Sequence, residues 1–174
     1  MVGMEISVAG NDSIRIKGKN VTLIADPASK SGPADISLSL KKGTIPLKVE
    51  GVRLQISGEG EYEVGGVKIT GVSADSQIVF TGEVDGVRFV IGEAQALEKA
   101  LSKLDETQVA IIKVLGSFNP QIITGLGPNA SLLYGLHRDG ALNELGKKEL
   151  TPVSKYVVKK DLLAPEAEEI VALG

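Results

Sequence analysis

The sequence predicts a β-rich α+β domain, and three features support this fold class. Up to about residue 91, short runs of alternating apolar and polar residues are separated by Gly, Asn and Asp, which is typical of β-hairpins. Beyond that point, apolar residues recur at helical spacing. Aromatic residues make up only 3% of the chain and Trp is absent, so the core must consist of Val, Ile, Leu and Ala.

The predicted strands of the first part are short and are bounded by turn residues. They are Met4–Ala9, Ser13–Lys17, Val21–Ala25, Asp35–Leu40, Val52–Ile56, Tyr62–Val64, Val67–Val72, Gln77–Thr81 and Val87–Ile91. Asp26-Pro27 ends the third strand, because proline cannot continue a hydrogen-bonded ladder. Asp85-Gly86 is a strong signal for a tight turn between the last two.

The remainder of the chain predicts a mixture of elements. An apolar stripe at i, i+3, i+4 and i+7 predicts an amphipathic helix over Glu93–Leu104. Four more strands and one or two short helices complete the prediction: strands at Val109–Leu115, Gln121–Thr124, Lys155–Lys159 and Glu169–Leu173, and helix within Ser131–Leu145. No repeat or linker is found, so residues 1–174 are predicted to form one domain.

Composition argues against several classes of function. The net charge is −3 and aromatic residues are few, so we expect no nucleic-acid binding. No apolar run approaches the roughly 18 residues of a membrane span, so we expect no membrane partner. The chain lacks cysteine and begins without a basic and apolar leader, which favours a cytoplasmic protein.

The chain has one histidine and no cysteine, so it cannot build a metal site from these residue types alone. The histidine is His137, in the polar stretch Leu136-His137-Arg138-Asp139, and no Gly-x-Ser-x-Gly motif accompanies it. We therefore interpret His137 as a surface or half-buried turn residue, with a catalytic role as the weaker alternative. No catalytic residue is predicted.

Two other patterns have a functional and a structural interpretation. Gly125–Ala130 matches the loose Gly-x-Gly-x-x-Gly/Ala fingerprint, but Pro128 removes a backbone donor, so a turn between strand and helix is favoured over a phosphate loop. Glu59, Glu61 and Glu63 alternate along a strand and therefore share one face. A solvated face is favoured there, and an oxygen-ligand site for calcium or magnesium is the alternative.

The segment Gly58–Val72, with sequence GEGEYEVGGVKITGV, resembles a hallmark of one protein family. That family is the small metal-dependent hydrolases of the metallo-β-lactamase superfamily, in the branch of L-ascorbate-6-phosphate lactonase-like proteins. The order and spacing of four other segments resemble it too: Met4–Pro27, Ala34–Ile36, Gly86–Glu93 and Asp161–Pro165. The resemblance implies an αββα sandwich, with two mixed sheets face to face and helices outside.

The resemblance also implies where metal ligands would lie, and this chain lacks them. The family motif His-x-His-x-Asp-His follows the strand that corresponds to Asp35–Ser39, where this chain reads Leu40-Lys41-Lys42-Gly43-Thr44-Ile45. Lys42 therefore falls at or beside a ligand position, and a fixed ammonium there would repel a divalent ion.

Two later ligand positions are affected in the same way. The family's bridging aspartate falls near Glu93, and its late histidine, which follows the penultimate core strand, falls near Leu126 or Gly127. Gly116–Pro120 leads directly into the predicted strand Gln121–Thr124, so the helix that normally separates the two late strands is expected to be nearly lost. We therefore expect neither a metal nor a cofactor.

Three functions remain open. The first is a non-catalytic, metal-free relative of these hydrolases that binds or assembles with an unknown protein or small molecule. The second is a phosphoesterase or lactonase in which Asp26, Asp35 and Glu93 converge at one end of the sheets and hold Mg²⁺ or Mn²⁺. The third is a structural homo-oligomer formed through exposed edges or apolar faces. Asp26, Asp35, Lys42 and Glu93 are the candidate residues of the former metal cleft.

Overall fold

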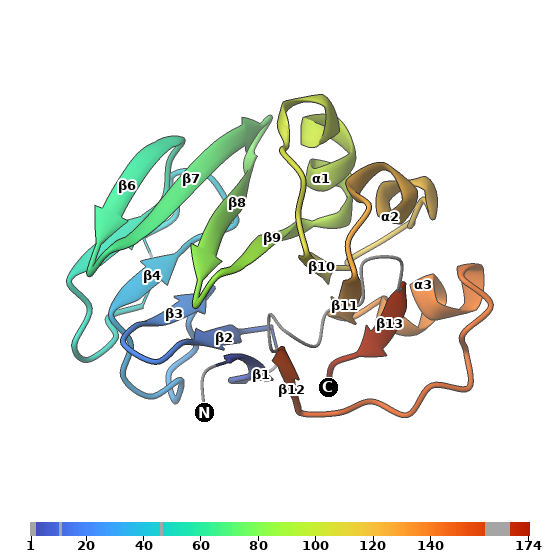
Figure 1. The fold of residues 1–174 in the computed structure, drawn as a ribbon, viewed down its shortest axis with the longest axis horizontal. Coiled ribbons are helices and arrows are strands. Elements are labelled where there is room, and N and C mark those ends of the chain that lie inside the picture. Colours follow the sequence, from blue (N-terminus) through green and yellow to red (C-terminus); the bar gives the residue numbers. More distant parts are fainter. Residues whose placement is uncertain (1–2, 11, 46, 159–167) are drawn as a thin grey trace.

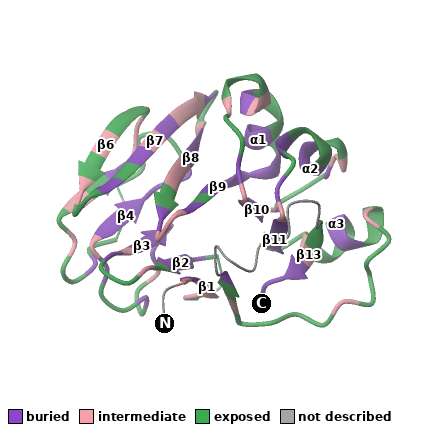
Figure 2. Cartoon of the chain, viewed as in Figure 1, coloured by how far each residue is buried: buried purple, intermediate pink, exposed green. Residues whose placement is uncertain are grey.

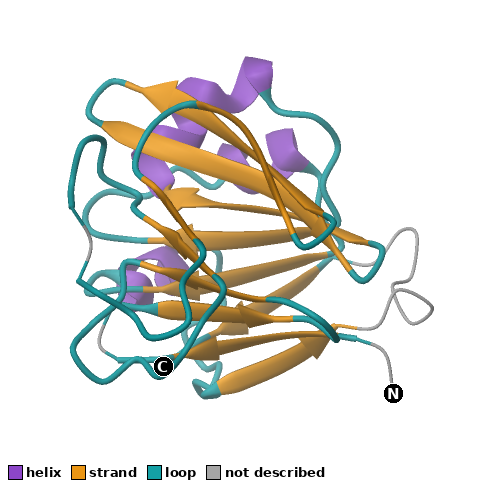
Figure 3. Cartoon of the chain, turned by 90° about the vertical axis from the view of Figure 1, so that its left-hand side faces the viewer, coloured by secondary structure: helices purple, strands orange, loops and turns teal. Residues whose placement is uncertain are grey.

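A computed structural model describes residues 3–10, 12–45, 47–158 and 168–174. It contains a six-stranded and a seven-stranded β-sheet, and the helices lie against the larger sheet (Figure 1). Viewed from the side, the strands run across the molecule and the loops gather at its two edges (Figure 3). The predicted two-sheet, β-rich α+β architecture is therefore confirmed.

The first sheet has the strand order β12-β1-β2-β3-β4-β5. Its strands are β1 (Met4–Val8), β2 (Ile14–Lys17), β3 (Thr22–Ala25), β4 (Ile36–Leu38), β5 (Leu54–Ile56) and β12 (Lys155–Val158). The pairs from β12 to β3 are antiparallel, whereas β3, β4 and β5 are parallel. The carboxyl ends of β3 and β4 consequently lie at the same edge.

The second sheet has the strand order β13-β11-β10-β9-β8-β7-β6. Its strands are β6 (Gly60–Val64), β7 (Val67–Ala74), β8 (Gln77–Val84), β9 (Val87–Glu93), β10 (Val109–Lys113), β11 (Ala130–Tyr134) and β13 (Glu169–Ala172). The hairpin strands β6–β9 are antiparallel, whereas β9, β10, β11 and β13 are parallel. Hairpins need only short turns, while each parallel pair needs a crossover connection.

Two apolar layers hold the elements together. Alternate residues of both sheets, such as Ile16, Phe80 and Ile111, fill the space between the sheets. The opposite face of the second sheet packs against α1 (Ala94–Ala100), α2 (Gln121–Leu126) and α3 (Arg138–Glu144). Figure 2 shows the resulting stripes of buried residues along the strands and along one side of each helix. Within the described residues no helix covers the outer face of the first sheet, so the sandwich has helices on one side only.

Between residues 121 and 145 one prediction is wrong and another holds in part. Gln121–Thr124 is the start of helix α2, not a strand. The predicted helix within Ser131–Leu145 is present as α3, but Ala130–Tyr134, which precedes it, is a strand. Short apolar runs such as these carry no periodicity that separates a buried strand from a helix. A helix therefore does connect β10 to β11, and the expected loss of this helix is also wrong.

The remaining elements agree with the prediction apart from their ends. Helix α1 is shorter than predicted and continues as a 3-10 turn over Leu101–Lys103. Strands β8 and β9 are longer, ending at Val84 and Glu93. Lys159 and the resemblance segment Asp161–Pro165 lie outside the described residues. No helix in the described part of the chain is long and apolar enough to cross a membrane.

Candidate functional site

The carboxyl ends of parallel strands from both sheets lie at one edge of the sandwich, which we call the carboxyl edge. It comprises the residues that end or follow β3 and β4 in the first sheet and β9, β10 and β11 in the second. Contacts between the sheets join the two halves: Lys42 N donates to Ser76 O at 2.8 Å and Ile78 N donates to Leu40 O at 2.7 Å. Open α/β sheets typically bind ligands at this edge of their parallel strands.

Three polar side chains form a row across the second sheet at the carboxyl edge. Lys113 is in register with Glu93 on one side and with Tyr134 on the other. Side chains two residues apart on a strand point to the same face. The preceding row, Ile91, Ile111 and Leu132, belongs to the core between the sheets. Glu93, Lys113 and Tyr134, which we call the polar row, therefore face the first sheet.

Lys113 spans the space between the sheets and pairs with Asp26. The Lys113 Nζ lies 3.2 Å from Asp26 Oδ2, and only 13% of the lysine side chain and 25% of the aspartate side chain are exposed. The other carboxylate oxygen of Asp26 accepts a hydrogen bond from Leu40 N at 3.0 Å. An ion pair removed from water to this degree has a stronger Coulomb interaction than a surface pair, but each charge depends on its partner.

The backbone around Asp26 holds its carboxylate in place. Asp26 has a φ of 50°, a left-handed conformation that aspartate tolerates better than most residues. Its N–H donates to Leu38 O at 2.8 Å and its carbonyl accepts from Ser13 Oγ at 2.5 Å. The Asp26-Pro27 turn predicted to end a strand therefore also aims a carboxylate at the second sheet.

The two flanking members of the polar row lack comparable partners. The Tyr134 hydroxyl is buried and has no hydrogen-bond partner within the described residues. Burial raises the pKa of Tyr134 well above its usual value, and the negative charges of Asp26 and Asp12 raise it further, so the hydroxyl stays protonated. Glu93 is 8% exposed, and its carboxylate makes no hydrogen bond or ion pair in the part of the chain described. The pKa of Lys99 on α1 is raised mainly by Asp75 and further by the negative charge of Glu93, so Glu93 has one basic neighbour.

Asp35, one of the predicted cleft residues, lies at the opposite edge. Its carboxylate accepts a hydrogen bond from Thr22 N at 2.8 Å and lies 3.8 Å from Arg53 Nη2. Thr22 begins β3 and Asp35 precedes the parallel strand β4, so both belong to the amino ends of these strands. The predicted convergence of Asp35 with Asp26 and Glu93 is therefore wrong, whereas the latter two both lie at the carboxyl edge.

Lys42 follows β4 in the sequence and so belongs to the carboxyl edge, but its side chain contacts Ser73 and Glu59 instead of Asp26. Its ammonium donates to Ser73 Oγ at 3.2 Å and lies 3.6 Å from Glu59 Oε1, and 44% of the Lys42 side chain is exposed. The lysine that faces a carboxylate between the sheets is Lys113, which is not among the predicted cleft residues. A signal was present, because Lys113 continues the alternation of Val109 and Ile111 toward the inner face of an otherwise apolar strand.

His137 is a surface residue, as predicted, but its position relative to the late strands differs from the expectation. The expected late-histidine position near Leu126 and Gly127 depended on a strand at 121–124, which is a helix in the structure. In chain order, the penultimate strand of the second sheet is β11, and His137 follows its end by three residues. The His137 backbone N–H donates to Val114 O at 2.9 Å, but its side chain is exposed and makes no hydrogen bond in the described structure.

These side chains do not fit the divalent ion of a metallohydrolase. Among the described residues, no three or more His, Cys, Asp or Glu side chains are grouped closely enough to hold a metal. Asp26 is already neutralised by Lys113, and a catalytic zinc needs about three protein ligands. A fixed ammonium beside the remaining carboxylate would oppose the entry of a dication.

The other two patterns singled out in the sequence are structural. Gly127, with a φ of 60°, ends helix α2, so Gly125–Ala130 runs from a helix into a strand and is not a strand-to-helix phosphate loop. Glu61 and Glu63 are exposed on β6, while Tyr62 and Val64 pack against the core. The predicted solvated face is thus confirmed.

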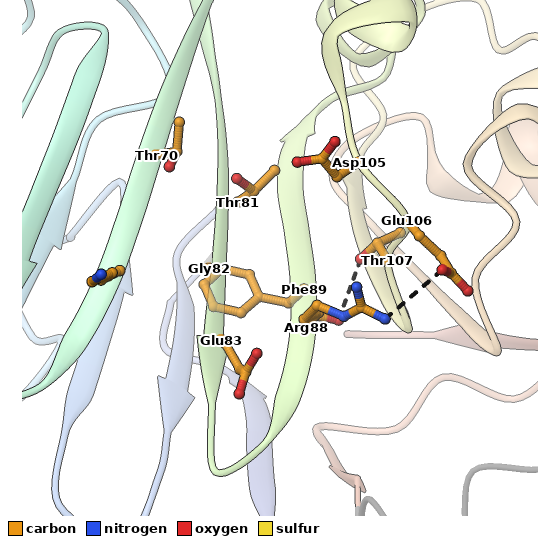
Figure 4. Close-up of a pocket in the computed structure, with 10 residues that line it drawn as sticks. Thr70, Thr81, Gly82, Glu83, Arg88, Phe89, Asp105, Glu106 and Thr107 are labelled. Atoms are coloured by element: carbon orange, nitrogen blue, oxygen red, sulfur yellow. Dashed lines mark hydrogen bonds and ion pairs between the residues drawn. The ribbon is translucent and has the colours of Figure 1, made fainter.

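A pocket of about 210 Å³ lies on the outer face of β7–β9, away from the polar row (Figure 4). Thr70 and Thr81 from neighbouring strands line it together with charged residues of both signs. Arg88 lies 3.9 Å from Glu106, and Thr107 Oγ1 donates to the Arg88 carbonyl at 3.3 Å. Three acidic and two basic side chains line the pocket, so its charge is mixed and identifies no class of ligand.

Comparison with solved structures shows similar folds over nearly the whole chain. A protein from Thermotoga maritima described as a zinc-dependent hydrolase of the metallo-β-lactamase superfamily has a TM-score of 0.76 and 19% identity, covering 98% of each chain. A protein from Parabacteroides distasonis described as a metal-dependent hydrolase has a TM-score of 0.63 and 12% identity, covering 98% of this chain and 94% of its own. The metallohydrolase Igni18 from Ignicoccus hospitalis has a TM-score of 0.61 and 10% identity, covering 90% and 99%.

Comparison by sequence is less informative. No protein-family model matches the chain, and no curated protein is significantly similar to it.

Proposed function

We propose that this chain, which has the metallo-β-lactamase fold, is a metal-free and non-catalytic member of that fold and acts as a binding or assembly module. The observation that supports this proposal most strongly is the Asp26–Lys113 ion pair between the sheets. It lies at the edge where hydrolases of this kind are expected to hold their metal, so the chain supplies a cation of its own there.

The proposal includes the setting in which the module works. We expect one domain over residues 1–174, located in the cytoplasm, with a protein or small molecule as partner. The net charge of −3 argues against nucleic acid as that partner. A homo-oligomer is one form that assembly can take, and light scattering on a size-exclusion column tests it directly: a monomer at high concentration removes this form.

A hydrolase with a carboxylate-bound Mg²⁺ or Mn²⁺ is less well supported. Of the three carboxylates that it requires, Asp35 is at the opposite edge and Asp26 is paired with Lys113. Glu93 alone supplies too few ligands, since hard divalent ions take about six oxygen ligands, several of them from the protein in a stable site.

Metal analysis of the wild-type protein tests the metal-free proposal. The protein is incubated separately with Zn²⁺, Mn²⁺ and Fe²⁺, desalted, and analysed by plasma mass spectrometry beside a hydrolase of the same fold with a complete ligand set. We expect far less than one metal per chain after desalting. About one retained ion per chain, reduced by Glu93→Ala, would overturn the proposal.

An activity screen tests the non-catalytic part. Phosphomonoesters, phosphodiesters and lactones are offered to the protein with each divalent metal, and the Glu93→Ala variant is assayed in parallel. We expect equal, background rates for both proteins. Turnover that depends on a metal and disappears in Glu93→Ala would instead support the hydrolase.

A further inference from the structure

The electrostatic setting of Lys113 differs from that of an ordinary surface lysine. Its ammonium is held between the sheets, against Asp26 and in the row next to Glu93. Lys42, by comparison, pairs with Glu59 at 3.6 Å while 44% and 63% of the two side chains are exposed. Burial of this kind is expensive for a charge unless it balances other buried charges.

The neighbours of Lys113 present oxygen atoms that favour a cation. Asp26 and Glu93 carry negative charge on either side of the inter-sheet space, and the exposed Asp12 contributes negative potential at Tyr134. The Tyr134 hydroxyl is a second, independent indication, because it is 2% exposed and has no hydrogen-bond partner among the described residues. A buried hydroxyl without a partner is costly, so an occupant with a polar or charged atom is favoured beside it.

We infer that the Lys113 ammonium is a tethered replacement for a bound cation, and that removing it exposes a latent cation site made by Asp26, Glu93 and Tyr134. This inference rests on the proposed metal-free function and deepens it. The ligand class follows from the donors: carboxylate and hydroxyl oxygens suit hard divalent ions such as Mn²⁺, and small alkylammonium ions resemble the lost side chain.

The geometry explains why the wild-type protein does not take up such an ion. The Lys113 stem arises from the central strand of the polar row, and its head already lies 3.2 Å from Asp26. A tethered cation has no binding entropy to lose on each encounter, so it competes with a free ion at a high effective concentration. Truncation to alanine removes both the competing charge and the atoms that fill the space.

Cation rescue of Lys113→Ala tests the inference. Thermal unfolding is measured for wild type, Lys113→Ala, Lys42→Ala and the double variant Asp26→Asn/Lys113→Ala. Each protein is titrated with MnCl₂ and with methylammonium chloride, against NaCl at equal ionic strength. We expect Lys113→Ala to unfold at lower temperature than wild type and each cation to raise its Tm by about 3 °C or more over NaCl.

The other three proteins supply the controls. Wild type and Lys42→Ala should respond to both cations only as they respond to NaCl, and loss of Asp26 should abolish the rescue in the double variant. An equal response of all four proteins, or no response in Lys113→Ala, would overturn the inference. Metal retained by the wild type would instead overturn the proposed function, so the two failures are distinguishable.

A second pair of variants covers the case in which Lys113→Ala does not fold. Lys113→Met keeps most of the side-chain volume and removes the charge, leaving the Asp26 carboxylate without its counter-ion. Asp26→Asn in the same chain removes that uncompensated charge, so the double variant should recover a large part of the lost Tm. A double variant no more stable than Lys113→Met contradicts the inference, because the lysine charge would then not be balancing Asp26.

Discussion

Two consecutive rows of side chains across the second sheet differ completely in chemistry. Ile91, Ile111 and Leu132 are aligned across β9, β10 and β11 and are fully buried in the core between the sheets. The next row on the same strands and the same face is the polar row, Glu93, Lys113 and Tyr134. One pleat of the sheet thus separates an ordinary apolar core from a set of buried polar groups.

The difference separates side chains that the fold needs for core packing from side chains whose chemistry can change without loss of the fold. The apolar row joins the layers and can be replaced only by side chains of similar volume. In the polar row, Tyr134 still belongs to the core between the sheets, whereas Glu93 and Lys113 place charge at the carboxyl edge, where sheets of this kind bind ligands. Substitutions in and around the two rows therefore test whether they act as differently as their environments indicate.

The largest effect is expected in the apolar row. Ile111→Ala removes three carbon atoms from a fully buried position and should lower the free energy of unfolding by about 3–4 kcal/mol. Urea unfolding with an unchanged m-value measures this loss, and Ile45→Ala, at a side chain that is 90% exposed, is the matched control. A loss below about 1 kcal/mol would show that the rows do not differ in the expected way.

The turn after the polar row is expected to be nearly as sensitive. Gly135 has a φ of +104°, and a Cβ there would lie 2.8 Å from the Val114 carbonyl oxygen. Gly135→Ala should therefore cost about 2–3 kcal/mol, because backbone strain and a clash with a main-chain atom coincide. In Gly140→Ala, where a Cβ meets open space within helix α3, denaturation should instead show a gain of about 0.5–1 kcal/mol.

The third prediction concerns the Tyr134 hydroxyl. Tyr134→Phe removes a buried donor without a partner among the described residues, so it should stabilise the protein by about 1 kcal/mol at pH 7. Tyr156→Phe is the comparison, because the Tyr156 hydroxyl donates to Glu169 Oε2 at 2.6 Å and its loss should destabilise. Chemical denaturation measures both variants. If the free energy of unfolding changed in the same direction in both, the assignment of an unpartnered hydroxyl to Tyr134 would be contradicted.

Alkaline pH sharpens this comparison. The pKa of Tyr134 is raised in the folded protein, so above about pH 10 the unfolded chain loses a proton that the folded protein keeps. The free energy of unfolding is therefore unaffected by this group below the pKa that Tyr134 has in the unfolded chain, and it decreases as the pH rises above that pKa. Unfolding free energies measured from pH 8 to 11 should fall less steeply for Tyr134→Phe than for wild type, and parallel curves would contradict the prediction.

The smallest effect is expected for the exposed lysine at the same edge. Lys42→Ala breaks a pair that is largely exposed, so the unfolding free energy should change by about 0.5 kcal/mol or less. The small change that is present should diminish in high salt, because exposed charges are screened. A loss as large as that of Lys113→Met would show that burial is not what distinguishes the two lysines.

Most of the fold was predictable from local signals. Alternating residues and turn residues located the hairpin strands, because the period of two and the turn chemistry are both encoded within a few residues. Gln121–Thr124 was misassigned as a strand because short apolar segments do not reveal whether they are strand or helix. Ala130–Tyr134 was not predicted as a strand, because only its pairing with β10 and β13 makes it one.

The site was predictable only in part. The family resemblance predicted that Asp26 and Glu93 lie at one end of the sheets, and both are found at the carboxyl edge. The same resemblance directed attention to Lys42 instead of Lys113. Asp35 was misplaced because its position before a strand puts it at the amino edge. Lys113 was missed because a lysine at a strand end is usually a solvated residue, and nothing local indicates the carboxylate opposite it.

What the sequence by itself determined is the absence of a full histidine and cysteine ligand set, since a count of residue types does not depend on the fold. It also determined the β-rich class, through periodicities that act over a few residues. Only the tertiary structure decided which lysine meets which carboxylate. Asp26 and Lys113 are 87 residues apart and lie on different sheets, so their contact depends on strand register and on how closely the two sheets pack.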